Sequence, residues 1–261
     1  MSPLAGRTVV VSGVGPGLGH QVAAAVVRDG GNAVLGARTG AALARSARAI
    51  DPDGAHTAYR TTDITDEGRC EELAGLAVER FGRIDAVVHV AALDSHFGGL
   101  ADADFATWQS VLDVNLLGSL RMTRACLPAL RERGGSVVFI GTQSAVAAPS
   151  QVRQAAYAAS KGALTSAMYS LARELGPHRI RVNTVLPGWM WGPPVQAYVR
   201  FTAESEGVDP AVVRKRLSDR MALPELATDA DVADAAAFLV SDRSKSITGQ
   251  SLLVNAGELM R

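Results

Sequence analysis

Cysteine is scarce in this sequence: Cys70 and Cys126 are the only two among 261 residues. They stand outside any Cys-x-x-Cys spacing and have no histidine nearby. The chain therefore gives no basis for a disulfide framework or a zinc site. We expect a protein of a reducing compartment that holds no metal.

Long apolar runs and an excess of one charge are also missing. No apolar stretch approaches the roughly 20 residues that span a bilayer, and the opening segment MSPLAGRTVVVSG has no signal-peptide layout. Lys and Arg together number 26, as do Asp and Glu, which gives no reason to expect nucleic acid or an anionic membrane as partner. The expectation is a cytoplasmic protein that acts on a small molecule.

The chain alternates between short β-branched runs and longer Ala-rich segments. The runs are almost continuously apolar, which is typical of strands buried on both faces of a parallel sheet. The alternation predicts an α/β fold, a Rossmann-type doubly wound domain with a seven-stranded parallel sheet and helices on both faces. Predicted strands cover 7–13, 32–38, 56–61, 85–91, 135–141, 180–186 and 250–255. Predicted helices lie near 18–29, 40–50, 66–81, 104–131, 154–176 and 229–241.

No linker of proline, serine or charged residues divides the chain, so residues 1–261 are predicted to form a single domain. The stretch 187–228 departs from the alternation, with five prolines around one helical piece at about 210–221. A connection of this length is usually functional. We expect a substrate lid.

The segment VVVSGVGPGLGHQVA (9–23) joins the first predicted strand to the first predicted helix and carries Gly13, Gly17 and Gly19. Glycine permits a tight turn and lets the backbone approach a pyrophosphate, while the helix N-terminus offers free N–H groups. Three glycines alone are weak evidence. Their position between a strand and a helix is the context that nucleotide binding requires, so we interpret the segment as a dinucleotide-binding loop.

The end of the second predicted strand, LGART (35–39), bears on the choice of nucleotide. Ala37 stands where an NAD site usually has an acid for the ribose hydroxyls, and Arg38 follows it. Arg38 is able to pair with a 2′-phosphate in bidentate fashion. The alternative is a solvated surface arginine. NADP(H) is favoured as cofactor, and NAD(H) stays open.

Tyr157 and Lys161, in YAASK (157–161), stand four residues apart and share one face of a predicted helix. A free tyrosine has a pKa of about 10, and a neighbouring ammonium lowers it by stabilising the phenolate. Tyr157 would then exchange a proton with a substrate oxygen held by the hydroxyl of Ser144. The alternative is a solvated helix face and an unrelated loop serine.

These motifs together resemble the short-chain dehydrogenase/reductase family over essentially the whole chain. The resemblance rests on SGVGPGLG (12–19), DITD (63–66), NLLG (115–118), Ser144, YAASK (157–161), RVNTVLPG (181–188) and TGQSLLVNAGE (248–258). It implies an NAD(P)(H)-dependent oxidoreductase that interconverts a ketone and a secondary alcohol. It also implies a homo-oligomer, a tetramer or a dimer, with helices 104–131 and 154–176 between subunits.

The resemblance also implies roles for single residues. Tyr157 would be the acid/base, Lys161 would lower its pKa and hold the nicotinamide ribose, Ser144 would position the substrate oxygen, and Asn115 would tie a water to Lys161. Asp63 and Ile64 would meet the adenine. The full cofactor-binding set is Gly13, Pro16, Gly17, Leu18, Gly19, Arg38, Asp63, Ile64, Ala91, Tyr157, Lys161, Pro187, Gly188 and Met190.

Two positions depart from the family pattern. The family usually has Asn-Asn-Ala-Gly after the fourth strand, whereas this chain has HVAA (89–92). His89 is interpreted as a core histidine or, alternatively, as a strand-end group near the adenine. Gly192 stands where the family often has a threonine that binds the nicotinamide carboxamide.

The segments after the fourth and sixth predicted strands are rich in large apolar side chains. Such residues either pack in a core or wall an apolar pocket. We expect a bulky, mostly apolar substrate of alicyclic, terpenoid or polyketide type. The residues concerned are Leu93, Phe97, Trp189, Met190, Trp191, Tyr198 and Phe201.

Two other functions stay open. An epimerase or dehydratase on the same scaffold would recycle its bound cofactor and give no net absorbance change at the nicotinamide band. A non-catalytic dinucleotide-binding protein would have no need of Asn115, Ser144, Tyr157 and Lys161 together.

Overall fold

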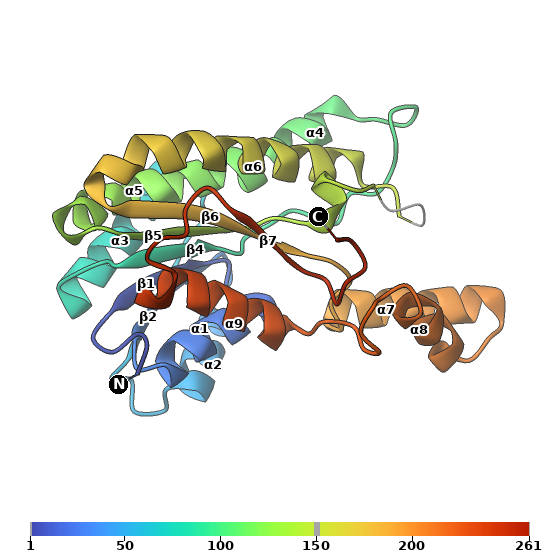
Figure 1. Ribbon diagram of the computed structural model, residues 1–261, viewed down its shortest axis with the longest axis horizontal. Helices are drawn as coiled ribbons and strands as arrows, with labels where there is room; N and C mark the ends of the chain where they lie inside the picture. Colours follow the sequence, from blue (N-terminus) through green and yellow to red (C-terminus); the bar gives the residue numbers. More distant parts are fainter. Residues whose placement is uncertain (1, 149–151, 261) are drawn as a thin grey trace.

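A parallel sheet of seven strands, in the order β3-β2-β1-β4-β5-β6-β7, forms the centre of the molecule (Figure 1). The computed structural model describes residues 2–148 and 152–260. The strands are β1 (Thr8–Ser12), β2 (Asn32–Ala37), β3 (Thr57–Thr61), β4 (Ala86–His89), β5 (Gly135–Ile140), β6 (Ile180–Pro187) and β7 (Ser251–Val254). The chain winds outward from β1 to β3, then crosses to β4 and winds the other way. The predicted Rossmann-type fold is confirmed, and ligands of such sheets bind at the carboxyl ends of the strands near this crossing.

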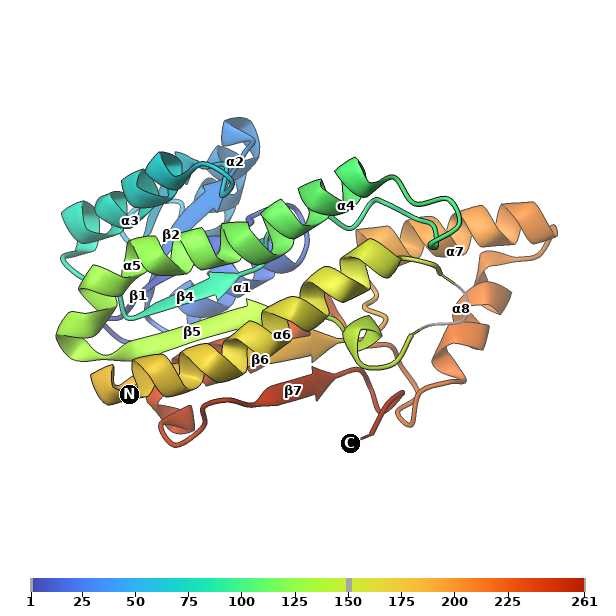
Figure 2. The same ribbon diagram turned by 90° about the horizontal axis from the view of Figure 1, so that it is seen from above.

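Helices cover both faces of the sheet (Figures 1 and 2). Alternate residues of β1 show why: Val9 and Val11 join the apolar cluster under α1 and α9, whereas Val10 joins the cluster under α3, α5 and α6. Both faces of the central strands are therefore buried, as their unbroken apolar sequence predicts. The helices of these layers are α1 (Leu18–Arg28), α2 (Gly40–Ile50), α3 (Glu67–Phe81), α4 (Phe105–Leu112), α5 (Ser119–Arg133), α6 (Ala155–Leu175) and α9 (Asp229–Val240).

The helix expected at 104–131 is not uniform. It consists of α4, a π-helical turn at Asp113–Gly118 and α5, which ends at Arg133. The π turn contains Asn115, whose side chain is fully buried. Single π turns inside α-helices often occur at functional sites.

The stretch 187–228 contains two helices, α7 (Pro193–Glu206) and α8 (Pro210–Ser218), rather than one. The expectation of one helical piece at about 210–221 did not include α7, which begins at Pro193 and Pro194. They occupy the first turn of α7, where proline lacks only a hydrogen bond that the helix would not make anyway.

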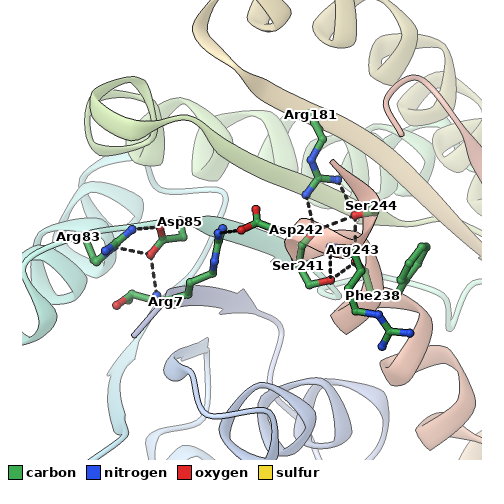
Figure 3. Close-up of polar contacts among 10 residues, drawn as sticks. Arg7, Arg83, Asp85, Arg181, Phe238, Ser241, Asp242, Arg243 and Ser244 are labelled. Carbon is green, nitrogen blue, oxygen red and sulfur yellow. Dashed lines mark hydrogen bonds and ion pairs between the residues drawn. The ribbon is translucent and has the colours of Figure 1, made fainter. Parts of the chain in front are cut away.

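Charged side chains meet at the amino ends of the strands (Figure 3). The buried carboxylate of Asp85 accepts hydrogen bonds from the backbone of Thr8 at 2.9 Å and from Nε of Arg83 at 2.8 Å. Arg7 pairs with Asp242. This edge lies opposite the carboxyl ends of the strands, so its charges serve the fold rather than a ligand.

Three further findings bear on the sequence expectations. Within residues 2–148 and 152–260, no helix combines the length and apolar character needed to cross a membrane. The same residues include no cluster of three or more His, Cys, Asp or Glu side chains able to hold a metal ion. Cys70 and Cys126 are buried free thiols, and burial raises the pKa of Cys70 to about 11.

Candidate active site

The loop between β1 and α1 is shaped by close backbone contacts. A Cβ on Gly13 would lie 2.1 Å from the backbone nitrogen of Ala91, and one on Gly19 would lie 2.2 Å from the carbonyl oxygen of Gly13. No side chain caps α1, and no acid lies in its first turn. The first N–H groups of α1 are thus available to an anion, and the loop fits a dinucleotide pyrophosphate. Gly17 is the N-cap residue, with Leu18 and Gly19 in the first turn.

A cavity of about 380 Å³ lies at the carboxyl ends of β2 and β3. Asp63 lies there, and its carboxylate accepts hydrogen bonds from the backbone and hydroxyl of Thr65, at 3.0 and 2.8 Å. These bonds, together with the charge of Arg38, lower the pKa of Asp63 against the opposing effect of burial. The side chain of Ile64 packs in the core instead, so only its backbone is free to meet an adenine. The cavity is lined by Arg38, Thr61, Asp63, Asp66 and Arg69.

The residues expected around the nicotinamide lie where β6 ends. Pro187 is the last residue of β6, and the backbone of Gly188 bonds to Val254. A Cβ on Gly192 would lie 2.8 Å from a carboxylate oxygen of Asp229, whose pKa is raised by burial. The carboxylate therefore occupies the space that a side chain at 192 would need. A threonine at this position would therefore require the Asp229 side chain to move.

Tyr157 and Lys161 project from α6 toward the end of β5. The ammonium of Lys161 is buried and donates a hydrogen bond of 2.7 Å to the carbonyl oxygen of Ile140. It lies 5.9 Å from the centre of the Tyr157 ring. The side chain of Tyr157 is also hydrogen-bonded to the hydroxyl of Thr142, just beyond β5. The structure thus brings together the pair that the sequence predicted.

The pKa values of this pair are shifted mainly by burial. Burial, helped by the negative charge of Asp94, raises the pKa of Tyr157 above its ordinary value, against the smaller opposing effect of Thr142. Burial lowers the pKa of Lys161 to about 8. The net shift at Tyr157 is opposite to the lowering expected from Lys161, because burial disfavours the phenolate more than its surroundings stabilise it.

Asn115 braces the site rather than facing it. Its side-chain oxygen accepts a 2.7 Å bond from the backbone nitrogen of Leu93, and its nitrogen donates to the Leu93 carbonyl and to Ser160, at 3.2 and 2.9 Å. Its backbone carbonyl accepts a bond from Ser119. The polar groups of Asn115 thus hold the loop after β4 against α6. Its predicted water-binding role stays a prediction.

Thr142 is the polar residue of this site that the sequence reading missed. Ser144, the hydroxyl expected from the sequence, lies two residues farther on, in a short 3-10 turn (Gln143–Ala145). The signal that would have found Thr142 is its distance from the strand. It is the second residue after β5, and groups at the carboxyl ends of strands form the sites of this fold.

His89 is a core histidine, as preferred from the sequence. Its ring stacks on Phe139, with 5.0 Å between centroids, and its Nε2 lies 2.8 Å from the hydroxyl of Thr123. Burial and the nearby charge of Lys161 lower the pKa of His89 to about 3. It is therefore neutral at physiological pH and lies beneath the site rather than in it.

Comparison with known proteins agrees with this arrangement. Residues 13–258 match the family described as enoyl-(acyl carrier protein) reductase. L-fucose dehydrogenase of Bos taurus is 30% identical over 253 residues, covering 97% of this chain and 89% of the relative.

Solved structures agree as well. A short-chain type dehydrogenase/reductase from Mycobacterium ulcerans is 28% identical with a TM-score of 0.87, over 98% of this chain and 90% of its own. The F189W actinorhodin polyketide ketoreductase, solved with NADPH, is 26% identical with a TM-score of 0.86, over 95% of each chain.

The chain belongs to the short-chain dehydrogenase/reductase family. It is an NAD(P)-dependent oxidoreductase that acts on CH–OH or carbonyl groups.

Proposed function

We propose that this enzyme uses NADPH to reduce the ketone of a bulky, mostly apolar substrate to a secondary alcohol. One observation carries the proposal: Tyr157, Lys161 and Thr142 converge at the end of β5. The dinucleotide, when bound, supplies a hydride from its nicotinamide ring. The protein holds the ketone and delivers the proton.

The protonation state of Tyr157 supports the reductive direction. Its pKa lies above the ordinary value of a tyrosine because of burial and the charge of Asp94, so the phenol carries its proton at neutral pH. A protonated phenol is the general acid that a ketone oxygen needs as it gains negative charge. Lys161, charged below about pH 8, stabilises the phenolate left behind.

Arg38 supports NADPH rather than NADH. The Arg38 side chain is exposed and lines the cavity at the ends of β2 and β3. It forms no ion pair with any residue in the described ranges 2–148 and 152–260. A guanidinium in such a position suits a 2′-phosphate. Fluorescence titration with each cofactor tests this choice, and tighter binding of NADH would contradict it.

The substrate side supports an apolar ligand in a way that differs from the sequence expectation. Trp189, Trp191 and Tyr198 pack against a separate apolar cluster formed by α7 and α8, so they build the lid itself. Large apolar side chains left exposed nearby include Phe97 and Leu100, in the segment after β4, and Phe201 on α7. These two segments project beyond the same end of the sheet, on opposite sides of it (Figure 1). Similarity to a polyketide ketoreductase agrees with a ketone of polyketide type.

Replacement of Tyr157 by Phe tests the reaction. We expect turnover to fall by at least about a thousandfold, while the NADPH dissociation constant changes less than twofold, because only the proton donor is lost. Tyr169→Phe is the matched control, since Tyr169 lies on the same helix with 52% of its surface exposed. Full activity of Tyr157→Phe would refute the proposed role.

A substrate panel tests the ligand class. Fused-ring ketones, small polar ketones and sugars including L-fucose are compared through NADPH consumption or NADP⁺ reduction at the nicotinamide absorbance band. Net absorbance change with the fused-ring ketones is the expected result. Turnover of small polar ketones or sugars alone would overturn the apolar assignment, and conversion without an absorbance change would indicate an epimerase or dehydratase.

A further inference from the structure

Two hydroxyls compete for the role of holding the substrate oxygen beside Tyr157. Ser144 has the expected sequence spacing, but it makes no side-chain hydrogen bond to a residue within 2–148 or 152–260. The hydroxyl of Thr142 lies within hydrogen-bonding range of the side chain of Tyr157, at the same strand end where the Ile140 carbonyl accepts a bond from Lys161. Contact with the proton donor therefore distinguishes Thr142 from Ser144.

The position of Thr142 is fixed by the sheet. The backbone nitrogen of Gly141 bonds to the carbonyl of Val185 at 2.8 Å, which continues the pairing of β5 with β6 to the residue before Thr142. The carbonyl of Ile140, one residue earlier, accepts the bond from Lys161. Thr142 is thus held next to the Tyr157–Lys161 pair by the same strand end.

The turn after Thr142 is anchored from the other side. Nε2 of Gln143 donates to the carboxylate of Glu258 at 2.9 Å, and its side-chain oxygen accepts a 2.6 Å bond from Asn255. The C-terminal segment therefore holds the residue between the two hydroxyls. This tether limits the rotation that would bring Ser144 to the place of Thr142.

The hydrogen bonds of Thr142 also orient its proton. The backbone nitrogen of Ser144 donates to Oγ1 of Thr142 at 3.2 Å. A hydroxyl has one proton and two lone pairs, so this contact uses a lone pair and leaves the proton of Thr142 to point toward Tyr157. A ketone oxygen placed beside the Tyr157 phenol lies within reach of the same proton.

We propose that Thr142, not Ser144, is the catalytic hydroxyl that donates a hydrogen bond to the reacting oxygen. The inference rests on the proposed reduction. In that reaction the carbonyl carbon gains a C–H bond from the hydride, and the oxygen gains an O–H bond from the Tyr157 proton. The phenolate is then reprotonated from water. Thr142 stabilises first the charge on the substrate oxygen and then the phenolate.

The test compares Thr142→Val, Thr142→Ser and Ser144→Ala, using a ketone that the wild type reduces. Loss of one donor to a developing oxyanion typically costs about 10² to 10³ in kcat. We expect a loss of this size in Thr142→Val, recovery to within about fivefold of wild type in Thr142→Ser, and less than about a threefold change in Ser144→Ala. The NADPH dissociation constant should stay within about twofold in all three, which verifies folding.

A second readout separates catalysis from structural support. The Thr142 bond lowers the pKa of Tyr157, so Thr142→Val should shift the alkaline rise of alcohol oxidation to higher pH. Ser144→Ala should leave it in place. A hundredfold loss in Ser144→Ala, alone or together with Thr142→Val, would overturn the assignment, as would an active Thr142→Val.

Tyr157→Phe, assayed in parallel, distinguishes the two levels of failure. If it retains activity, the proposed reduction itself fails. If it is inactive while Thr142→Val is active, only the role of Thr142 fails.

Discussion

Charged side chains at the amino ends of the strands have different partners from those at the carboxyl ends. At the amino edge they pair with each other, as Arg83 with Asp85 and Arg7 with Asp242. At the carboxyl edge, the buried ammonium of Lys161 bonds to a backbone carbonyl, and Arg38 has no ion-pair partner in the described part of the chain. The buried carboxylate at the amino edge holds strands together, whereas Lys161 and Arg38 at the carboxyl edge form no ion pair within the described residues, although Arg69 there pairs with Glu72. Stability and catalysis should therefore respond to different substitutions.

Gly13 is the position where one substitution should most strongly reduce both stability and cofactor binding. It lies at the functional edge, yet its φ of +100° and the 2.1 Å approach of the Ala91 nitrogen make it structural as well. We expect Gly13→Ala to lower the free energy of unfolding by more than about 3 kcal/mol and to abolish NADPH binding. Denaturant unfolding measures the first effect. Gly15→Ala, where a Cβ meets nothing within 4 Å, should cost less than about 1 kcal/mol; equal losses at both positions would contradict the steric account.

Asp85→Ala tests the amino edge. The variant leaves the backbone nitrogen of Thr8 and the guanidinium of Arg83 without a buried acceptor, so the free energy of unfolding should fall by about 2–3 kcal/mol. The turnover number should stay within twofold of wild type. Asp242→Ala removes a pair whose carboxylate is 75% exposed and should cost less than about 1 kcal/mol. A large loss of turnover in either variant would show that the edges are not independent.

Lys161→Arg tests the carboxyl edge through pH. Because the pKa of Lys161 is lowered to about 8, kcat/KM for reduction should be steady below pH 8 and fall about tenfold per unit above it, as the ammonium loses its proton. In Lys161→Arg the fall should move to higher pH, since a guanidinium stays charged. An unchanged pH profile would show that the fall in kcat/KM above pH 8 comes from a group other than Lys161.

The same lowered pKa predicts a separate trend in stability. The unfolded chain, with a lysine pKa near 10.5, binds more protons than the folded chain between pH 8 and 10.5. The contribution of Lys161 therefore makes stability rise across this window, while activity falls. Thermal unfolding of wild type and Lys161→Met, compared across these pH values, measures it.

Arg38→Ala has the smallest expected effect of these substitutions, and it should affect the binding of NADPH but not that of NADH. Loss of a charge-assisted bond to the 2′-phosphate should weaken NADPH binding about tenfold and leave NADH binding unchanged. Arg69→Ala is the matched control, since Arg69 lines the same cavity but its guanidinium bonds to Glu72 at 2.9 Å. Equal weakening of both cofactors by Arg38→Ala would contradict a role in phosphate recognition.

Much of the site could be predicted because its parts depend on short local patterns. The glycine loop follows directly from a strand–turn–helix sequence, and the shared helix face of Tyr157 and Lys161 follows from a four-residue spacing. The prediction of Ser144 has the same origin and stays a prediction beside the proposed Thr142. A spacing counted back from Tyr157 crosses a loop whose length is not fixed, whereas Thr142 is located by where β5 ends.

Other features had no local signal. The two prolines that open α7 are compatible with a loop as well as with a first helical turn, and the tertiary structure shows a helix there that packs on α8. The tryptophans after β6 had two possible environments, and the tertiary structure packs them against the apolar cluster of α7 and α8. The direction of the pKa shift at Tyr157 also depended on burial, which sequence spacing does not measure.

The sequence by itself determined the order of the strands, the glycine loop between the first strand and the first helix, and the Tyr157–Lys161 pair, because periodicity and glycine placement act over a few residues. The tertiary structure alone decided which hydroxyl meets Tyr157 and how burial shifts the pKa values of Tyr157 and Lys161. It also decided that Asp229 fills the space beside Gly192. These outcomes depend on segments far apart in the chain meeting at one end of the sheet, and on the water excluded where they meet.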